Sequence, residues 1–341
     1  MKRQLLGVAA ILLSISTYAQ DNPLWMRYCA ISPDGTTIAF TYKGDIYTVP
    51  STGGRASQIT TNPAHDTKPI WSPDGKKIAF ASDRMGSMDI FEVNKEGGIP
   101  KRLTTHSGNE TPVAYKDAGH ILFLANIMPT AEDAQFPSGQ FQQVYEVNTE
   151  GGRPVLFSSM PMEDISINHT GNTLLYHDKK GYEDPWRKHH TSSITRDIWL
   201  CSLNGNRTFR KQTAFNGEDR TPVWASDDKS FYYLSEEKGS FNIFKRDIDG
   251  NTSKQITNHT KHPVRFLSAA SNGTLCYGYD GEIYTVKEGA IPQKVQISIV
   301  TDKNDKDLIR QIKRSGATEI SLSPDAKEIA FVLRGDVYVT S

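Results

Sequence analysis

The sequence predicts an all-β protein, and more narrowly a six-bladed β-propeller built from four-stranded antiparallel blades. Two observations carry this prediction. One sequence motif recurs along most of the 341 residues, at intervals of about 40 to 54 residues, which is typical of propeller blades. Glycine and aromatic residues are abundant, with 26 Gly, 14 Tyr, 14 Phe and 5 Trp, and the helical spacing of Ala, Leu and Glu is weak. This composition favours strands and tight turns.

Each copy of the motif has the same order of elements. An apolar residue precedes "SPDG", as at residues 32–35 and 72–75, and a short apolar strand and a polar loop follow. Next come a strand with an aromatic residue, a Gly turn and a final strand similar to "QIT". The aromatic residue recurs as Tyr47, Phe91, Tyr145, Trp199, Phe244, Tyr284 and Tyr338. Four short strands per copy match a propeller blade, because only neighbouring blades can cover both of its faces.

Six complete copies lie between Trp25 and Ile297, and a seventh begins at Ile320. The seventh copy follows a charged connection and lacks the Gly turn and the final strand, so we expect it to be the truncated start of a second propeller. The expected organisation is a signal peptide over residues 1–20, a six-bladed propeller over 21–298, a linker over 299–319 and the first strands of a following propeller over 320–341.

The first twenty residues have the pattern of a secretory signal. Lys2 and Arg3 precede an apolar run over residues 5–13, and small residues follow before Gln20. The run is too short to span a bilayer as a mature anchor, and no other stretch has spanning length. We therefore expect an exported, soluble, periplasmic protein without membrane insertion.

Charge and cysteine content exclude several functions. Lys and Arg together number 39, as do Asp and Glu, so the sequence has no electrostatic footprint for nucleic acid. The three cysteines, Cys29, Cys201 and Cys276, are too few and too scattered for a disulfide framework. Each lies among apolar strand residues, and we expect buried free thiols and no cofactor.

One face of the predicted ring carries loops that differ from blade to blade. Acidic residues stand where the chain enters the innermost strands, and we expect them to line one mouth of the central channel: Asp66, Glu110, Asp164 and Asp219. Two interpretations stay open. The acids solvate polar loops, or they form a polar funnel that handles charged chain ends or peptide backbone.

A long insertion on the same face, residues 178–196, concentrates basic and aromatic side chains. Its candidate contact residues are Trp186, Arg187, Lys188, His189, His190 and Arg196. Such a cluster could hold a carboxylate or an adjacent domain by charge-assisted hydrogen bonds. Alternatively, these residues pair with neighbouring acids and close the mouth. The adjacent histidines lack a matching Cys or His set, so we expect no metal site.

Searches for catalytic patterns find no nucleophile with a base and an oxyanion hole. The sequence contains no G-x-S-x-G, no H-E-x-x-H and no phosphate-binding loop. "DIDGN" at residues 247–251 resembles half a calcium loop, but no closing Glu follows, so it is interpreted as a hairpin turn. We expect no catalytic residue within these 341 residues.

The repeat "SPDGKKIAF", continued by "DIF" at residues 89–91, resembles the TolB-type propeller repeat. A narrower resemblance, to the N-terminus of bacterial tricorn-like proteases, rests on the signal segment, the six copies, "WRKHHTSSITRDIW" at residues 186–199 and the restart at "SLSPDAKEIAF". The resemblance implies a second propeller, a PDZ domain and a serine peptidase core beyond this chain, with propellers that channel peptides. The catalytic residues of that family lie beyond the first propeller, so none is assigned here.

The leading functional hypothesis is a non-catalytic propeller module of an exported tricorn-like serine protease. It would guide or filter oligopeptides and dock on the peptidase core of the same protein. The alternative is a stand-alone TolB-like propeller that binds a periplasmic protein. A third reading, a propeller enzyme such as a sugar or prolyl-peptide hydrolase, is disfavoured because the catalytic constellation is missing. A homo-oligomer is compatible with all three.

Overall fold

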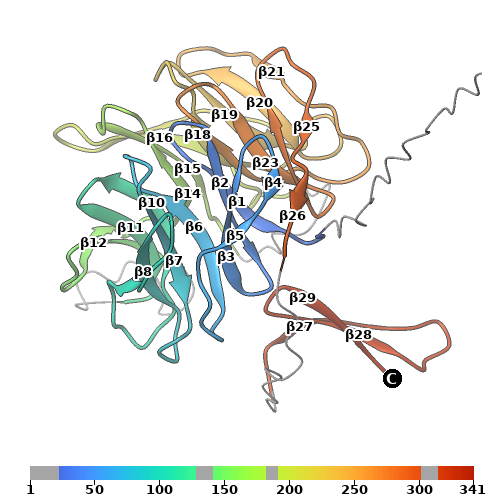
Figure 1. The fold of residues 1–341 in the computed structure, drawn as a ribbon. Coiled ribbons are helices and arrows are strands. Elements are labelled where there is room, and N and C mark those ends of the chain that lie inside the picture. Colours follow the sequence, from blue (N-terminus) through green and yellow to red (C-terminus); the bar gives the residue numbers. More distant parts are fainter. Residues whose placement is uncertain (1–22, 128–140, 182–190, 301–313) are drawn as a thin grey trace, which may run out of the picture.

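The computed structural model describes residues 23–127, 141–181, 191–300 and 314–341. These residues form strands joined by turns, and no helix occurs among them (Figure 1). The all-β prediction is therefore confirmed. It follows that the described part of the chain has no helix able to cross a membrane.

Antiparallel sheets of four strands follow one another along the chain. Sheet 1 comprises β1 (Arg27–Ile31), β2 (Thr37–Tyr42), β3 (Asp45–Pro50) and β5 (Ser57–Gln58). Sheet 2 comprises β6 (Asp66–Trp71), β7 (Lys77–Ser82), β8 (Asp89–Asn94) and β9 (Lys101–Arg102). Sheet 3 comprises β10 (Thr111–Asp117), β11 (His120–Ala125), β12 (Gln143–Asn148) and β13 (Val155–Ser158).

Three more sheets repeat this order in the second half of the chain. Sheet 4 comprises β14 (Met162–Ile167), β15 (Thr173–Asp178), β16 (Ile198–Ser202) and β17 (Thr208–Lys211). Sheet 5 comprises β18 (Asp219–Trp224), β19 (Ser230–Ser235), β20 (Asn242–Asp247) and β21 (Ser253–Gln255). Sheet 6 comprises β22 (Arg265–Ala269), β23 (Leu275–Tyr279), β24 (Glu282–Val286) and β25 (Gln293–Lys294). The predicted four-stranded antiparallel sheets are confirmed.

The first strands of the sheets contact one another in a closed cycle. The contacts run from β1 through β6, β10, β14, β18 and β22 and return from β22 to β1. Antiparallel sheets placed around a common axis in this way form a β-propeller. The arrangement brings residues that are far apart in the sequence to the same central wall.

The closing contact between sheets 6 and 1 uses two short strands. β26 (Ile297–Ser298) pairs in parallel with β4 (Gly54–Arg55) (Figure 1). The Gly54 N–H donates to the Gln296 carbonyl at 2.8 Å. Gly53 has φ of 92°, and a Cβ there would lie 2.6 Å from the Gln296 oxygen, so glycine is required for this close approach.

The "SPDG" segment forms the turn between the first and second strands of a sheet. In sheet 2 the Ser72 hydroxyl donates to Asp74 at 2.7 Å and accepts the Lys77 N–H at 2.9 Å. Gly75 adopts φ of 67°. The turn is thus held by local side-chain bonds to the backbone, which explains why this short motif recurs.

The threonine of the "QIT" segment has a structural role that repeats across the sheets. Thr60 Oγ1 accepts the Ile46 N–H and Thr104 Oγ1 accepts the Ile90 N–H, both at 2.9 Å. Thr257 does the same for Ile243 at 2.9 Å. These hydroxyls accept hydrogen bonds from buried backbone N–H groups near the start of the third strand. This role explains why the "QIT" segment ends in threonine.

Four of the predicted aromatic positions, Tyr47, Phe91, Tyr145 and Phe244, are buried in the core, whereas Tyr338 in the last sheet is 44% exposed. Tyr47 pairs across the strands with Phe40, with ring centroids 5.8 Å apart, and Phe91 pairs with Phe80 at 6.1 Å. Cross-strand aromatic pairs of this kind stabilise neighbouring strands. Phe40 and Phe80 are fully buried.

The last sheet contains three strands, β27 (Ala317–Leu322), β28 (Ile329–Leu333) and β29 (Asp336–Thr340). It projects from the closed cycle of sheets in Figure 1. Within the described residues, an ion pair of 2.8 Å between Arg334 and Asp83 ties it to that body. Several of its apolar side chains are exposed, among them Ile320, Leu322 and Val339.

Candidate functional site

A cavity of about 500 Å³ lies at the centre of the closed cycle and is lined by the first strands of all six sheets. Much of its wall is apolar, with contributions from Ile70, Val113, Ile165, Val223 and Leu267. Its charged lining residues include Lys68, Glu163, Asp164 and Arg196. The cavity therefore combines an apolar wall with a few polar groups, as ligand sites usually do.

The six lining strands share a conformational irregularity. Each shows a break in register within its pairing to the second strand. In five of them a non-glycine residue at the break is left-handed, with φ from 48° to 56°: Tyr28, Lys68, Asp164, Thr221 and Phe266. We call these five residues the cavity ring, because all of them line the cavity.

The cavity ring is an energetically unfavourable feature that the fold repeats. A left-handed non-glycine residue costs roughly 1–2 kcal/mol, and a bulge redirects the side chain of its strand. A strained conformation placed five times around one cavity favours the hypothesis that the ring is functional.

One part of the cavity ring is aromatic and basic. The Tyr28 and Phe266 rings meet with centroids 4.8 Å apart and planes inclined by 53°. Lys68 Nζ lies 5.8 Å from the centroid of Tyr28. Within the described residues, Lys68 has no ion pair with a carboxylate. Its ammonium is thus free for an incoming acceptor.

Another part of the cavity ring, at Asp164 and Thr221, is acidic and hydroxylic. The Thr221 hydroxyl donates to Asp164 Oδ2 at 2.6 Å, and the Asp164 side chain is 49% exposed. The Thr221 N–H donates to His177 Nδ1 at 3.3 Å. Because Nδ1 accepts this bond, Nε2 carries the proton that faces Glu163 Oε2 at 3.2 Å.

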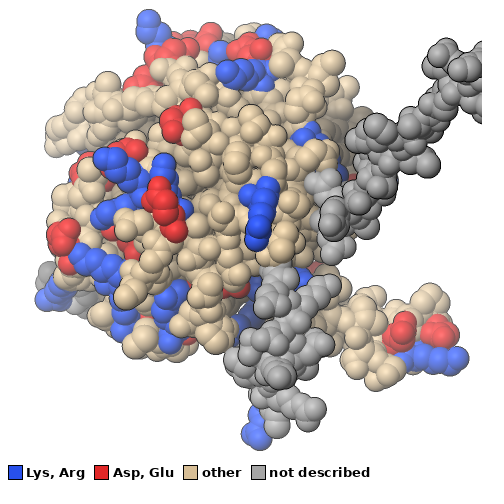
Figure 2. Space-filling model, viewed as in Figure 1, with Lys and Arg blue, Asp and Glu red and all other residues tan. Residues whose placement is uncertain are grey.

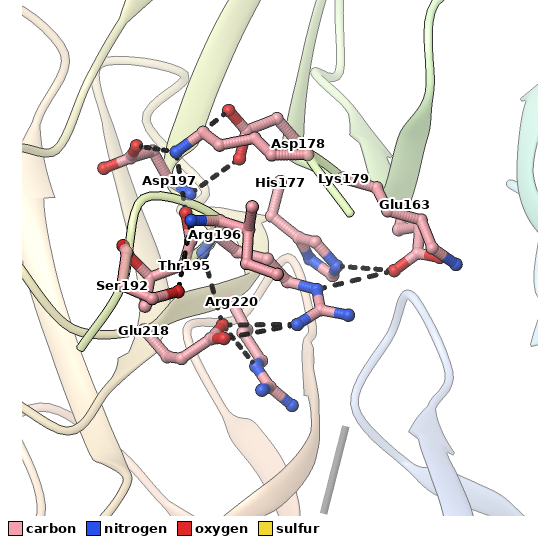
Figure 3. A network of polar contacts seen from close by, with 12 residues as sticks. Glu163, His177, Asp178, Lys179, Ser192, Thr195, Arg196, Asp197, Glu218 and Arg220 are labelled. Carbon is pink, nitrogen blue, oxygen red and sulfur yellow. Dashed lines mark hydrogen bonds and ion pairs between the residues drawn. The ribbon is translucent and has the colours of Figure 1, made fainter. Parts of the chain in front are cut away.

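Glu163 connects the cavity ring to a network of charges (Figure 3). Lys179 Nζ lies 2.8 Å from Glu163 Oε1, and Arg196 Nε lies 3.6 Å from Oε2. Burial alone would raise the pKa of Glu163, but His177 and Lys179 together lower it far below its usual range. Glu163 is therefore a fixed negative charge, and its partners hold it in place.

Arg196, a predicted contact residue, lies in this network and is only 4% exposed. Its Nη1 contacts Glu218 Oε1 at 3.3 Å, and Arg220 Nε contacts Glu218 Oε2 at 2.9 Å (Figure 3). Burial favours the neutral form of Glu218, but the two arginines lower its pKa. Arg196 thus reaches the cavity wall while its charge is already compensated.

Three of the four predicted acids are buried rather than placed at an open mouth. Asp66 is fully buried and accepts two hydrogen bonds from Arg84 Nη2, at 2.9 and 3.0 Å. Glu110 and Asp219 are 0% and 1% exposed, and burial raises the pKa of each to about 7. Only Asp164 lines the cavity. A contact role for the other three stays a prediction.

The remaining predicted contact residues, Trp186, Arg187, Lys188, His189 and His190, lie outside the described residues. Their proposed contacts stay predictions. The basic cluster is therefore represented in the structure by Arg196 alone.

Sequence reasoning missed most of the cavity ring. Tyr28, Lys68, Thr221 and Phe266 carry no motif, and their common feature is backbone conformation, which appears only in three dimensions. Two features of the sequence could have pointed to these residues. Each is the second or third residue of an innermost strand, and Pro follows Lys68 and Thr221. His177 and Glu163 were likewise not singled out.

The site is suited to binding. No group of three or more His, Cys, Asp or Glu residues in the described ranges is arranged to hold a metal ion. The surface in view in Figure 2 shows Lys and Arg interleaved with Asp and Glu. The arrangement offers apolar contact, an ammonium at Lys68 that has no ion pair among the described residues, and the half-exposed Asp164 carboxylate. Together these groups suit a ligand with mixed polarity such as a peptide.

Comparisons with known proteins agree with this architecture. The family described as the tricorn protease N-terminal beta propeller domain matches residues 23–290. Tricorn protease homolog 1 from Streptomyces coelicolor is 25% identical over 281 residues, which are 81% of this chain and 25% of that protein. The tricorn protease homolog from Saccharolobus solfataricus is 27% identical over 295 residues, or 82% of this chain and 26% of that protein.

A solved structure of the tricorn protease is similar in fold, with a TM-score of 0.70 at 22% sequence identity. The match covers 93% of this chain and 30% of that one. The chain thus spans between about a quarter and a third of the length of these three proteins.

Proposed function

The chain belongs to the family of tricorn protease N-terminal β-propeller domains, and we propose that it is the non-catalytic propeller module of an exported tricorn-like serine protease. In this proposal the module guides or filters oligopeptides through its central cavity and docks on the peptidase core of the same protein. The observation that carries the proposal is the cavity ring, five residues with left-handed backbone conformations that all line one central cavity.

A peptide fits the cavity for chemical reasons. The apolar wall would accept side chains, while Lys68 and Asp164 offer a hydrogen-bond donor and an acceptor to the main chain or to charged ends. Arg196 and Glu163 are compensated by other charges, so they would shape the wall rather than capture an ion. Weak contacts of this kind suit passage better than tight retention.

The proposal includes a domain organisation. The six four-stranded sheets would be the blades of one closed propeller over residues 21–298. Residues 299–319 would be a linker, and the last sheet within 320–341 would open a second propeller. The exposed apolar side chains of the last sheet support this part, because a neighbouring blade would bury them.

The proposal also includes export to the periplasm, with residues 1–20 as the signal peptide. Its support is the basic and apolar pattern at the start of the sequence.

The test measures binding of fluorescent oligopeptides to the chain by anisotropy. Lys68→Gln and Asp164→Asn should each weaken binding by about tenfold, the effect of losing one charge-assisted hydrogen bond. The matched controls are Lys76→Gln and Asp249→Asn, whose side chains are 78% and 87% exposed on the outer turns. These controls should bind as the unaltered chain does.

Equal binding by all variants would contradict a role for the cavity. A different result would favour the stand-alone protein-binding propeller. In that case no oligopeptide binds, an intact periplasmic protein of known identity does bind, and shortening residues 178–196 abolishes that complex.

A further inference from the structure

Two of the three cysteines meet at one place in the fold. Cys29 lies on β1 and Cys276 on β23, and both belong to one buried apolar cluster between sheets 1 and 6. Cys201 lies on β16 in a separate cluster between sheets 3 and 4. Cys29 and Cys276 are far apart in the sequence, and the closed cycle of sheets brings them into the same cluster.

The two thiols lie against the same strand, β22. The Cys29 thiol donates to the Phe266 carbonyl at 3.5 Å, and Cys276 is paired with Ser268, two residues further along that strand. The surrounding backbone is held by Ser268, whose Oγ accepts the Ile31 N–H at 3.0 Å and donates to the Cys276 carbonyl at 3.4 Å. Both strands are therefore fixed on either side of the sulfur pair.

The position of the pair is distinctive. Successive sheets are joined by the chain itself, whereas sheets 6 and 1 stand at opposite ends of the closed cycle. Their described ties are non-covalent, such as the β4 and β26 pairing and a 3.1 Å bond from the Met26 N–H to the Gly281 carbonyl. The two thiols thus lie at the interface between sheets 1 and 6, the neighbouring sheets that do not follow one another in the sequence. We call this interface the seam.

We propose that Cys29 and Cys276 form a disulfide that joins sheet 1 to sheet 6. Each thiol loses its proton and the pair gives up two electrons as the S–S bond forms. A small-molecule or protein disulfide accepts them by exchange and leaves as two thiols. The inference does not depend on peptide binding. It requires only that the chain meets such an oxidant while it folds.

The bond would form before the seam closes. In the folded state Cys29 is 4% and Cys276 0% exposed, and burial, followed by contact with Cys29, raises the pKa of the Cys276 thiol well above its usual value. A buried neutral thiol reacts slowly with disulfides. Oxidation is therefore expected during folding, and reduction of the closed propeller should be slow.

The test refolds the chain from guanidinium chloride with either oxidised plus reduced glutathione or reduced glutathione alone. After unfolding, free thiols are labelled with N-ethylmaleimide and counted by mass. The oxidised chain should carry one label, on Cys201, and the reduced chain three. The disulfide would close a loop of roughly 250 residues, for which Tm should rise by about 10 °C.

Two variants locate the bond. Cys201→Ser should still oxidise, with no label and the same rise in Tm. Cys276→Ser should carry two labels under both conditions and show no redox-dependent Tm. Three free thiols, glutathione adducts without a cross-link, or a disulfide that contains Cys201 would overturn the inference. If Cys276→Ser does not fold, the unaltered chain and Cys201→Ser still decide it.

Discussion

Sheet 1 and the last sheet are built from the same sequence repeat but differ sharply in burial. Residues 31–50 and 322–341 align without a gap, and both form antiparallel strands with matching register. In both, the motif serine donates to the motif aspartate and accepts a backbone N–H. Ile46 is nevertheless fully buried, whereas its counterpart Val337 is 51% exposed. The repeat is therefore sufficient to form the sheet, but its apolar side chains are buried only where neighbouring sheets cover them.

The largest expected effect compares the paired aromatic residues Phe40 and Phe331. Phe40→Ala should lower the free energy of unfolding by about 3–5 kcal/mol, because it removes a fully buried ring. Phe331→Ala, in the exposed last sheet, should lower that of the main transition by less than about 1 kcal/mol. Guanidinium unfolding followed by tryptophan fluorescence measures both. Equal losses would show that the last sheet is part of the same core.

The pH dependence of stability separates the two regions further. Burial raises the pKa of Glu110 and Asp219 to about 7 from ordinary values of 4.5 and 3.8. Since the folded pKa exceeds the unfolded one, the penalty for ionising these buried groups is absent below about pH 4 and grows until pH 7. The free energy of unfolding should therefore rise as pH falls from 8 to 5, by about 2–3 kcal/mol for each group.

Glu110→Gln together with Asp219→Asn should flatten that slope. In the last sheet, the hydrogen bond from Ser323 lowers the pKa of Asp325, so this group stays ionised over the whole window. An unchanged slope in the double variant, measured by denaturant titration at several pH values, would assign the pH dependence to other groups.

A smaller effect is expected at Thr104, whose hydroxyl accepts a backbone N–H near the start of the third strand. Thr104→Val leaves the Ile90 N–H, now bonded at 2.9 Å, without its acceptor, and should cost about 1–2 kcal/mol of stability. Thr340→Val in the last sheet lies at an exposed position and is the matched control, with an expected change within about 0.5 kcal/mol. Chemical denaturation compares the two, and a neutral Thr104→Val would refute the capping role.

The smallest effect is expected from restoring glycine to the first turn of the last sheet. Ala326 occupies the glycine position of the turn with φ of 55°, whereas Gly35 holds it in sheet 1. Ala326→Gly should stabilise the β27–β28 turn by about 1 kcal/mol, since the left-handed strain is removed. Hydrogen exchange of the β27 and β28 amides should slow about fivefold. Faster exchange would mean that the alanine is not strained.

Most of the fold was predictable because the repeat encodes local interactions. The SPDG turns, the aromatic pairs such as Phe40 and Tyr47, and the four-strand order all depend on residues close in sequence. The site was less predictable. Arg196 and Asp164 were identified from their charge, but Tyr28 and Phe266 meet only when the first and last sheets close. The burial of Asp66 and Asp219 also depends on neighbouring sheets, so polar residues expected at a mouth are inside.

The most direct test of the central claim is photo-crosslinking of an oligopeptide that carries a benzophenone side chain, followed by mass spectrometry of the labelled fragments. The account predicts labels on the strands that line the cavity, β1, β6, β10, β14, β18 and β22, and their loss when unlabelled peptide competes. Labels confined to the outer strands or to the last sheet, or labels that competition does not remove, would contradict a peptide path through the centre of the propeller.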